Sequence, residues 1–486
     1  MKLFLKSLSH TIFSQLLVAL IGLFILSFLS HKLSKEEIGL FLVIRRISTF
    51  CIPIFSLNLG LSLAKFSHNE NFNSINNFSD SIKIILIFNF LLLLPIYYLS
   101  DNIQIYIFNS LNYNFEFYAL IIFLLVNIFH NLVYNYFRGK QDYKLMNFIN
   151  IIFGLSGIIS LIFLILPINI GNNYVSYFYF LYSFILFSFD FLFIIKSLYF
   201  NNIIHNSKPK KTKINKIFLK YGISRIPSGL FIALIFTMPI LINSNLESAA
   251  SIGIVLSLCK IIQMLVFPFN VILVPEISKL VKNNHDIEIN KYIQFSFEII
   301  FSLLFLIGIS LYFFIPELII IAFGENYTSI ISPLKIILPF IGIYLGYIIL
   351  RGIIDGLYNK PYINIINSVS AGTLFLLIYF AKTSVYWIVI SFGFSIVLLG
   401  INSILFLIYN TKVVFFNKNI ICSILLNIVC FLIFYILSEI NLNISIYNIL
   451  ILKFIIWSTI LFLSILFYKY LNISWYKELT LKNIVS

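Results

Sequence analysis

Residues 38–64 of the chain read IGLFLVIRRISTFCIPIFSLNLGLSLA, an apolar stretch whose only charges are the adjacent Arg45 and Arg46. A helix that crosses a bilayer needs roughly 20 mostly apolar residues, so this stretch is long enough to span a membrane. Similar stretches recur along the chain between charged or Asn-rich clusters. They are continuously apolar, whereas the strands of a membrane barrel alternate apolar and polar residues over about ten positions. The sequence therefore predicts an all-α polytopic membrane protein.

The same criteria predict about 14 transmembrane helices along the chain. The first seven cover residues 8–30, 38–64, 81–100, 116–137, 147–167, 177–195 and 221–243. The second seven cover residues 250–278, 293–315, 331–350, 362–380, 386–409, 420–438 and 448–470. No segment between them is long enough for a soluble domain.

The composition agrees with this fold class and excludes several kinds of protein. Of the 486 residues, 60% are hydrophobic and 10% are charged, whereas a soluble protein has about 25% charged residues. A soluble enzyme, a disordered chain and a nucleic-acid-binding domain are therefore excluded. No P-loop, HExxH or GxSxG motif occurs, and the four cysteines show no CxxC spacing. We expect no catalytic activity, no metal and no cofactor.

The basic residues predict the orientation of the chain. Of the 33 Lys and Arg residues, 24 fall in segments on one side of the predicted spans, three on the other side and six within spans. Because cytoplasmic loops carry the excess of Lys and Arg, both termini are predicted to be cytoplasmic. The N-terminal span lacks a small-x-small cleavage site and is read as an uncleaved helix. The connector 208–213, KPKKTK, is expected to lie on anionic lipid and not on nucleic acid.

An internal duplication relates the two halves of the chain. Glu37-Ile38-Gly39-Leu40 recurs as Ser251-Ile252-Gly253-Ile254, and at the same offset of 214 residues Arg46 matches Lys260 and Lys65 matches Lys279. Phe137-Arg138-Gly139 matches Leu350-Arg351-Gly352 at an offset of 213. Chance matching between low-complexity apolar segments is the alternative explanation.

The repeat predicts two pseudo-symmetric six-helix lobes that have the same orientation in the membrane. The predicted parts are an N-terminal lobe 1–195, a basic cytoplasmic connector 196–220, a C-terminal lobe 221–409 and two additional helices with a cytoplasmic tail 410–486. Parallel repeats of this kind occur in secondary transporters, where rocking of the two halves gives alternating access to a central site.

Basic residues inside the apolar spans are the candidate site, because intramembrane charges are costly and by default mark function. Arg46 and Lys260 occupy equivalent repeat positions, roughly 11 Å from the outer ends of their helices, and are predicted to face a common cleft. Arg45 and Arg225 are further members of this cationic cleft, which would bind an anionic substrate. The alternative is that long basic side chains extend to the interface, as we expect for Lys335 and Lys453.

Two acidic residues, Asp190 and Glu298, also lie within predicted spans. They are candidates for coupling to protons or sodium, because a buried carboxyl group can titrate near neutral pH. Ion pairing with the cations, or an interfacial position without a special role, are the alternatives. Pro53 and Pro268, which lie at near-equivalent positions, make their helices the predicted moving elements.

Three segments resemble the polysaccharide transporter (O-antigen flippase) family of the multidrug/oligosaccharidyl-lipid/polysaccharide (MOP) exporter superfamily. They are VPEIS at 274–278, PELIIIAFGENY at 316–327, and the loop from Arg351-Gly352 to Pro361. The resemblance extends over nearly the whole chain, although its motifs are loose. It implies a fourteen-helix fold with a cationic cleft, in which Arg46 and Lys260 are cavity cations.

The resemblance also implies a function. The protein would flip an undecaprenyl-diphosphate-linked oligosaccharide, an O-antigen or capsule repeat unit used in lipopolysaccharide or other polysaccharide biosynthesis, across the bacterial inner membrane. Its partners would be that substrate and membrane lipids, with polysaccharide polymerase machinery as an open possibility. A lipid II flippase and a MATE-type drug exporter of the same fold are alternatives. A membrane glycosyltransferase or polymerase is disfavoured, because the predicted outer loops are too short to carry a catalytic site.

Overall fold

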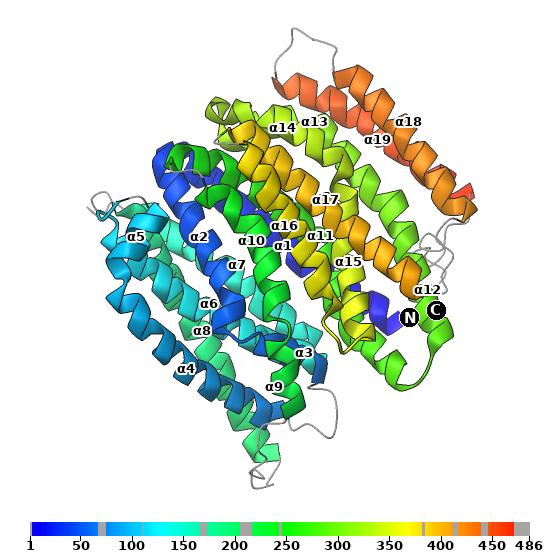
Figure 1. Ribbon diagram of the computed structural model, residues 1–486. Coiled ribbons are helices and arrows are strands. Elements are labelled where there is room, and N and C mark those ends of the chain that lie inside the picture. The colour runs from blue at the N-terminus through cyan, green and yellow to red at the C-terminus, as the bar shows by residue number, and fades with distance from the viewer. Residues whose placement is uncertain are drawn as a thin grey trace. The chain divides into compact units, whose positions relative to one another are not determined.

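The computed structural model describes residues 2–66, 74–108, 110–165, 173–204, 216–242, 245–381, 384–411, 417–438 and 446–470. Throughout these residues the regular elements are helices, and no strand is present (Figure 1). Fourteen helical segments of the described chain are long and apolar enough to cross a membrane. The predicted all-α polytopic fold is therefore confirmed. The basic segment 208–213 lies outside the described residues.

The chain forms two compact units. Unit 1 consists of Met1–Lys6, Ile272–Tyr358 and Val369–Ser486, and unit 2 of Ser7–Val271 and Asn359–Ser368. The boundary between the units falls inside one long helix, between Val271 and Ile272. The predicted lobes rest on the sequence repeat and remain a prediction.

Unit 2 contains the helices of the first half of the chain and the first part of the long helix. The helices are α1 (Lys2–Lys32), α2 (Lys35–Phe55), α3 (Leu59–Phe66), α4 (Ser74–Tyr98), α5 (Ser100–Phe108), α6 (Asn114–Gly139), α7 (Tyr143–Ile165), α8 (Tyr174–Ile204), α9 (Lys216–Ile223), α10 (Ile226–Leu241) and α11 (Leu246–Lys282). Helix α6 packs against α8, α3 and α2, and α10 packs against α2. Val126, Ile152 and Leu186 form one cluster of its apolar core.

Unit 1 contains the end of α11 and the helices that follow it, except for the beginning of α16, which belongs to unit 2 up to Ser368. They are α12 (Asp286–Ile299), the π-helical turn η1 (Ile300–Leu304), α13 (Phe305–Phe323), η2 (Glu325–Ile330), α14 (Ile331–Ile337), η3 (Leu338–Phe340), α15 (Ile341–Leu357), α16 (Tyr362–Ala381), α17 (Val385–Asn410), α18 (Lys418–Ser438) and α19 (Ile446–Tyr470). The last two helices pack against α13 (Figure 1). Phe313 and Phe434 form part of that apolar contact.

The predicted span 38–64 is not one continuous helix. Helix α2 ends at Phe55, and Leu57 (φ 49°) and Asn58 (φ 50°) adopt the left-handed backbone conformation before α3 begins. This conformation is uncommon for residues other than glycine, so surrounding contacts must hold it in place. The predicted span 221–243 is likewise interrupted between α9 and α10.

The two helix breaks meet each other within unit 2. The Asn58 side-chain amide donates a hydrogen bond of 2.8 Å to the carbonyl of Arg225, which precedes α10. The Ser62 hydroxyl donates one of 2.9 Å to the carbonyl of Phe218 in α9. The Arg225 carbonyl also accepts from the Gly229 N–H within α10, so the Asn58 amide is a second donor to it. The two side-chain hydrogen bonds thus connect the two breaks.

Helix α11, the repeat equivalent of α2–α3, continues without a break through Pro268 and Pro275. A helical proline has no N–H for the carbonyl four residues earlier. For Pro275 that carbonyl belongs to Val271, and the Nε of Arg138 in α6 donates to it at 3.2 Å. A buried arginine thus replaces the hydrogen bond that the proline removes.

The repeated glycines explain how closely α2 and α11 approach each other. A Cβ atom on Gly39 would collide with the backbone carbonyl of Leu246, and one on Gly253 would lie 2.6 Å from Leu42 Cδ1. The glycine of each repeat therefore faces the helix of the other repeat. Small residues at such positions are how membrane helices pack closely.

Candidate functional site

Arg46 and Lys260 lie beside the same aromatic ring, that of Phe236 in α10. The Lys260 Nζ atom is 4.0 Å from the ring centroid and the Arg46 Cζ atom is 5.9 Å from it. Arg46 is 5% exposed, and its Nη2 donates a hydrogen bond of 3.0 Å to the Ser257 hydroxyl in α11. We call these four residues the Phe236 cluster.

The elements of unit 2 determine the geometry of the Phe236 cluster. Helix α2 supplies the arginine, α10 the ring, and α11 the lysine and the serine. The Thr237 hydroxyl donates to the backbone carbonyl of Arg46 at 3.4 Å, which links α10 to α2. The Ser257 hydroxyl donates to Gly253, so its oxygen lone pairs accept from the guanidinium. The structure thus brings together two cations that are far apart in the sequence.

Arg225 belongs to a second cationic cluster, at the helix breaks. Its Cζ atom lies 3.6 Å from the centroid of the Tyr221 ring, and Lys65 Nζ lies 4.8 Å from the same centroid. Arg225 Nη1 donates to the carbonyl of Asn359 at 3.3 Å. Lys65, Tyr221 and Arg225 form the Tyr221 cluster. Because Arg225 immediately precedes α10 and Phe236 lies three turns into that helix, the two clusters are separated by roughly 16 Å along its axis.

Lys65 and Arg138 are site candidates that the sequence analysis missed. Both residues are predicted to lie in loops on the cytoplasmic side, whereas both are buried inside unit 2. The Arg138 guanidinium donates to Val271, and also to the carbonyl and side-chain oxygens of Asn270 at 3.1 and 3.3 Å. The repeat was the available signal, because it matches these residues with Lys279 and Arg351.

Arg45 faces other neighbours than the Phe236 cluster. It is partly buried and lies within electrostatic range of Tyr182 on α8, whereas Tyr179 is within range of both Arg45 and Arg46. The Tyr179 hydroxyl itself donates to the carbonyl of Phe41 at 2.7 Å. Successive residues of a helix point about 100° apart, which explains why Arg45 and Arg46 have different surroundings.

The buried acids of the described residues each have a partner outside the two clusters. In unit 2, Asp190 contacts the Nδ1 atom of His130 at 3.0 and 3.2 Å, and Glu116 accepts from Ser176. The partners in unit 1 are Asn417 for Glu298, Lys453 for Glu317 and Arg351 for Asp355. The two coupling candidates, Asp190 and Glu298, therefore belong to different units.

Lys453, which is predicted to extend to the membrane interface, forms a buried ion pair with Glu317. Its Nζ atom contacts both carboxylate oxygens of Glu317, at 2.8 and 3.0 Å, and donates to the carbonyl of Phe313 at 2.8 Å. This ion pair joins α19 to α13. No cluster of three or more metal-ligating side chains occurs among the residues that the structure describes.

The two clusters of unit 2 have a chemistry that suits an anionic ligand. Cation–π contacts are worth about 0.5–2 kcal/mol each. Guanidinium and ammonium groups form charge-assisted hydrogen bonds to phosphate and carboxylate oxygens. Broken helices inside a membrane also mark the binding sites of many transporters.

No family model and no curated protein sequence matches the chain. Among solved structures, the lipid II flippase MurJ in an inward closed conformation matches 96% of this chain and 99% of its own, at 17% identity and a TM-score of 0.68. The MATE multidrug transporter DinF-BH covers 86% of this chain and 97% of its own, at 16% identity and a TM-score of 0.67.

A mutant of the MATE transporter VcmN from Vibrio cholerae covers 84% of this chain and 98% of its own, at 13% identity and a TM-score of 0.61. The matched proteins are transporters and a flippase. Identities this low show a shared fold and do not transfer a substrate. The chain is thus a multi-pass membrane protein with the fold of MATE transporters and MurJ.

Proposed function

We propose that the protein is a transporter that flips an undecaprenyl-diphosphate-linked oligosaccharide across the bacterial inner membrane by alternating access. The observation that carries the proposal is the Phe236 cluster, in which Arg46 and Lys260 share one ring inside a membrane span. The diphosphate is the group that these cations would bind. The fold shared with transporters of lipids and drugs supports the same kind of activity.

The charge of the two clusters favours an anionic substrate over a cationic drug. Low dielectric inside a membrane strengthens the attraction between a cation and a phosphate and equally the repulsion between two cations. A site built on Arg46, Lys260 and Arg225 would therefore reject a lipophilic cation. This observation argues against the MATE-type drug exporter as the alternative.

A lipid II flippase remains the second candidate function, because lipid II is also a polyprenyl-diphosphate-linked sugar and MurJ has the highest TM-score of the three comparisons above. The cations do not distinguish the two lipids. The segments 274–278, 316–327 and 351–361, which resemble the polysaccharide transporter family, favour the O-antigen or capsule unit. Both termini would then be cytoplasmic, and a polysaccharide polymerase would be a partner on the outer side.

The experiment compares three probes in proteoliposomes that contain the purified protein. They are a fluorescent undecaprenyl-diphosphate oligosaccharide, fluorescent lipid II and the lipophilic cation rhodamine 6G, and each is followed by its appearance in the opposite leaflet or lumen. Faster movement of the oligosaccharide lipid supports the proposal. Faster movement of lipid II supports the alternative, and movement of the lipophilic cation alone contradicts both.

We infer further that Asp190 is a better candidate for proton coupling than Glu298. Asp190 is 1% exposed and is paired with a second titratable group, His130, whose ring stacks on Phe153. Glu298 instead accepts a hydrogen bond from the neutral Asn417. In the same proteoliposomes, Asp190→Asn should abolish the response of transport to a pH gradient while Glu298→Gln retains it. The opposite pattern would reassign the coupling to Glu298.

A further inference from the structure

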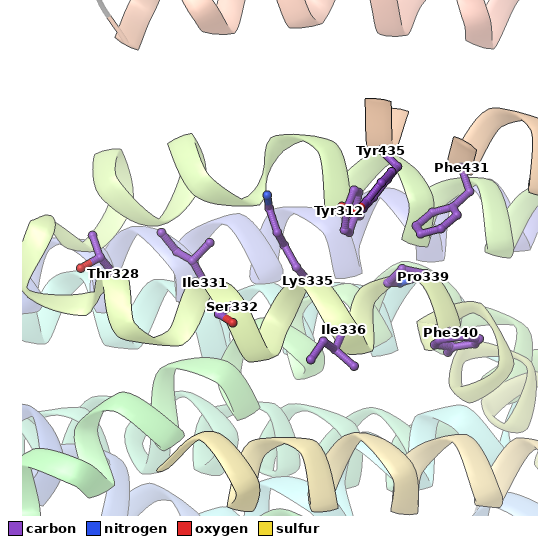
Figure 2. A pocket seen from close by; sticks show the side chains of 10 residues that line it. All are labelled: Tyr312, Thr328, Ile331, Ser332, Lys335, Ile336, Pro339, Phe340, Phe431 and Tyr435. Carbon is purple, nitrogen blue, oxygen red and sulfur yellow. The ribbon is translucent and has the colours of Figure 1, made fainter. Parts of the chain in front are cut away.

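Unit 1 contains a cavity of about 750 Å³ between α13, α14 and α18. Figure 2 shows Tyr312 on α13, Lys335 on α14, and Phe431 and Tyr435 on α18 around it. The side chains that line it include neither Asp nor Glu. The cavity is independent of the clusters of unit 2 and of the proposed transport function.

The polar groups of this cavity are available to a ligand. Within the described chain, the hydroxyl groups of Tyr312, Ser332 and Tyr435 have no hydrogen-bond partner, and Lys335 has no carboxylate partner. The Lys335 Nζ atom lies 5.6 Å from the centroid of the Tyr312 ring. One ammonium group and three hydroxyl groups therefore line the same space.

Apart from Thr328, the remaining lining is apolar and is open to the surroundings. The Phe340 side chain is 52% exposed and Ile336 is 45% exposed, and Phe431 packs against Tyr312 with ring centroids 5.3 Å apart. These residues belong to predicted membrane spans, so the surface beside the cavity faces hydrocarbon. A ligand that fits must have an anionic group for the ammonium and hydroxyl groups of the cavity. It must also have a hydrocarbon chain for the apolar surface beside the cavity.

We propose that this cavity binds one anionic phospholipid of the surrounding bilayer. The phosphate binds the Lys335 ammonium, the headgroup accepts and donates hydrogen bonds at Ser332 and Tyr435, and an acyl chain lies along Phe340 and Phe431. Charge complementarity selects an anionic lipid, because the cavity offers a cation and no acid. The bound lipid joins α18, which lies outside the sequence repeat, to α13 and α14.

Lys453 is a lysine of the same unit whose counter-ion is supplied by the protein itself. It contacts Glu317 through both carboxylate oxygens and so neutralises its charge within the protein. Lys335 makes no such pair among the described residues, and its counter-ion would come from the lipid. We therefore place the lipid phosphate at Lys335, and not at Lys453, whose charge Glu317 already balances.

Lipid binding is measured by native mass spectrometry of the full-length protein, titrated with phosphatidylglycerol or phosphatidylcholine. We expect one tight phosphatidylglycerol site, and Lys335→Ala should weaken it about tenfold, as loss of a charge-assisted hydrogen bond does. Lys335→Arg should retain it. Lys32→Ala, at the exposed end of α1, is the control and should leave it unchanged. Equal affinities for the two lipids, or an unchanged affinity in Lys335→Ala, would overturn the proposal.

A second measurement keeps the proposal testable if Lys335→Ala folds poorly. Phosphatidylglycerol with a photoactivatable acyl chain is cross-linked to the wild-type protein, and the labelled peptides are identified. Labelling within 312–340 and 431–435 supports the site. Labelling confined to other peptides contradicts the site. Labelling of 312–340 and 431–435 also contradicts it if excess phosphatidylcholine abolishes that labelling as efficiently as excess phosphatidylglycerol does.

Discussion

Arg46 and Arg225 of unit 2 have a different kind of partner from Lys453 and Arg351 of unit 1. In unit 2, Arg46 and Arg225 lie against aromatic rings and donate to a hydroxyl or a carbonyl oxygen. In unit 1, Lys453 pairs with Glu317 and Arg351 with Asp355. The contrast extends to equivalent repeat positions, because Arg138 donates to backbone carbonyls of α11 whereas Arg351 has a carboxylate partner.

This difference separates structural charge from functional charge. A buried ion pair is balanced within the protein and mainly fixes one helix against another. We propose that the ion pairs of unit 1 serve helix packing and that the Phe236 and Tyr221 clusters of unit 2 bind an anionic substrate.

The largest expected effect is on transport by the double variant Arg46→Ala/Lys260→Ala. Each lost charge-assisted contact is worth about 1.5–3 kcal/mol, so transport of the oligosaccharide lipid should fall at least about 100-fold. Initial rates in proteoliposomes measure this, and protein level and melting temperature serve as controls. The matched variant of unit 1, Lys453→Leu/Glu317→Leu, should retain transport. Equal losses in both variants would remove the distinction between the units.

The next effect is on stability and concerns the ion pair of unit 1. Lys453→Ala leaves the buried Glu317 carboxylate without its partner, which should cost about 3–5 kcal/mol. Unfolding in mixed detergent micelles measures this cost. Lys453→Leu/Glu317→Leu should recover most of it, because no unpaired charge remains. A Lys453→Ala protein as stable as the wild type would show that this pair does not hold α19.

A smaller effect is expected from the ring that Arg46 and Lys260 share. Phe236→Leu preserves an apolar side chain and removes the π face. The lost contact of the ring with the Arg46 and Lys260 side chains is worth about 0.5–2 kcal/mol. Transport should fall several-fold, while Phe236→Tyr should remain close to the wild type. The measurement is the KM for the oligosaccharide lipid in proteoliposomes. If leucine and tyrosine behave alike, the ring does not position the cations.

A comparable effect, on stability, concerns Arg138 and the carbonyl that Pro275 leaves without a donor. Arg138→Met should lower the free energy of unfolding by about 1–3 kcal/mol, since a buried acceptor loses its partner. In a Pro275→Ala background the new N–H can bond the Val271 carbonyl, so the same change should cost less. A double-mutant cycle measures this coupling. Additive costs would show that the two features are independent.

The helices are predictable from the sequence because an apolar run of sufficient length has few alternatives to a membrane span. The helix breaks are not predictable in this way. The break at Leu57 and Asn58 is held by the contact between Asn58 and Arg225, which are 167 residues apart. Nothing in the local sequence reports such a contact.

The candidate site was partly predictable for a similar reason. Arg46 and Lys260 stand out because they are charged within apolar spans, and the repeat relates them. Phe236 does not stand out, because one phenylalanine among 54 in the chain carries no signal of its own. Lys453 was expected to extend to the interface because its partner, Glu317, is 136 residues away.

The central claim is that the Phe236 cluster binds the phosphate groups of a transported lipid. The most direct test is the affinity of the purified protein for undecaprenyl diphosphate, measured by titration calorimetry in detergent with rhodamine 6G as the cationic comparison. The wild type should bind the diphosphate lipid and Arg46→Ala/Lys260→Ala should bind it at least about 100-fold more weakly. Equal affinity of the two proteins for the diphosphate lipid would contradict the claim. So would a result in which the wild type binds the cationic dye and the double variant does not.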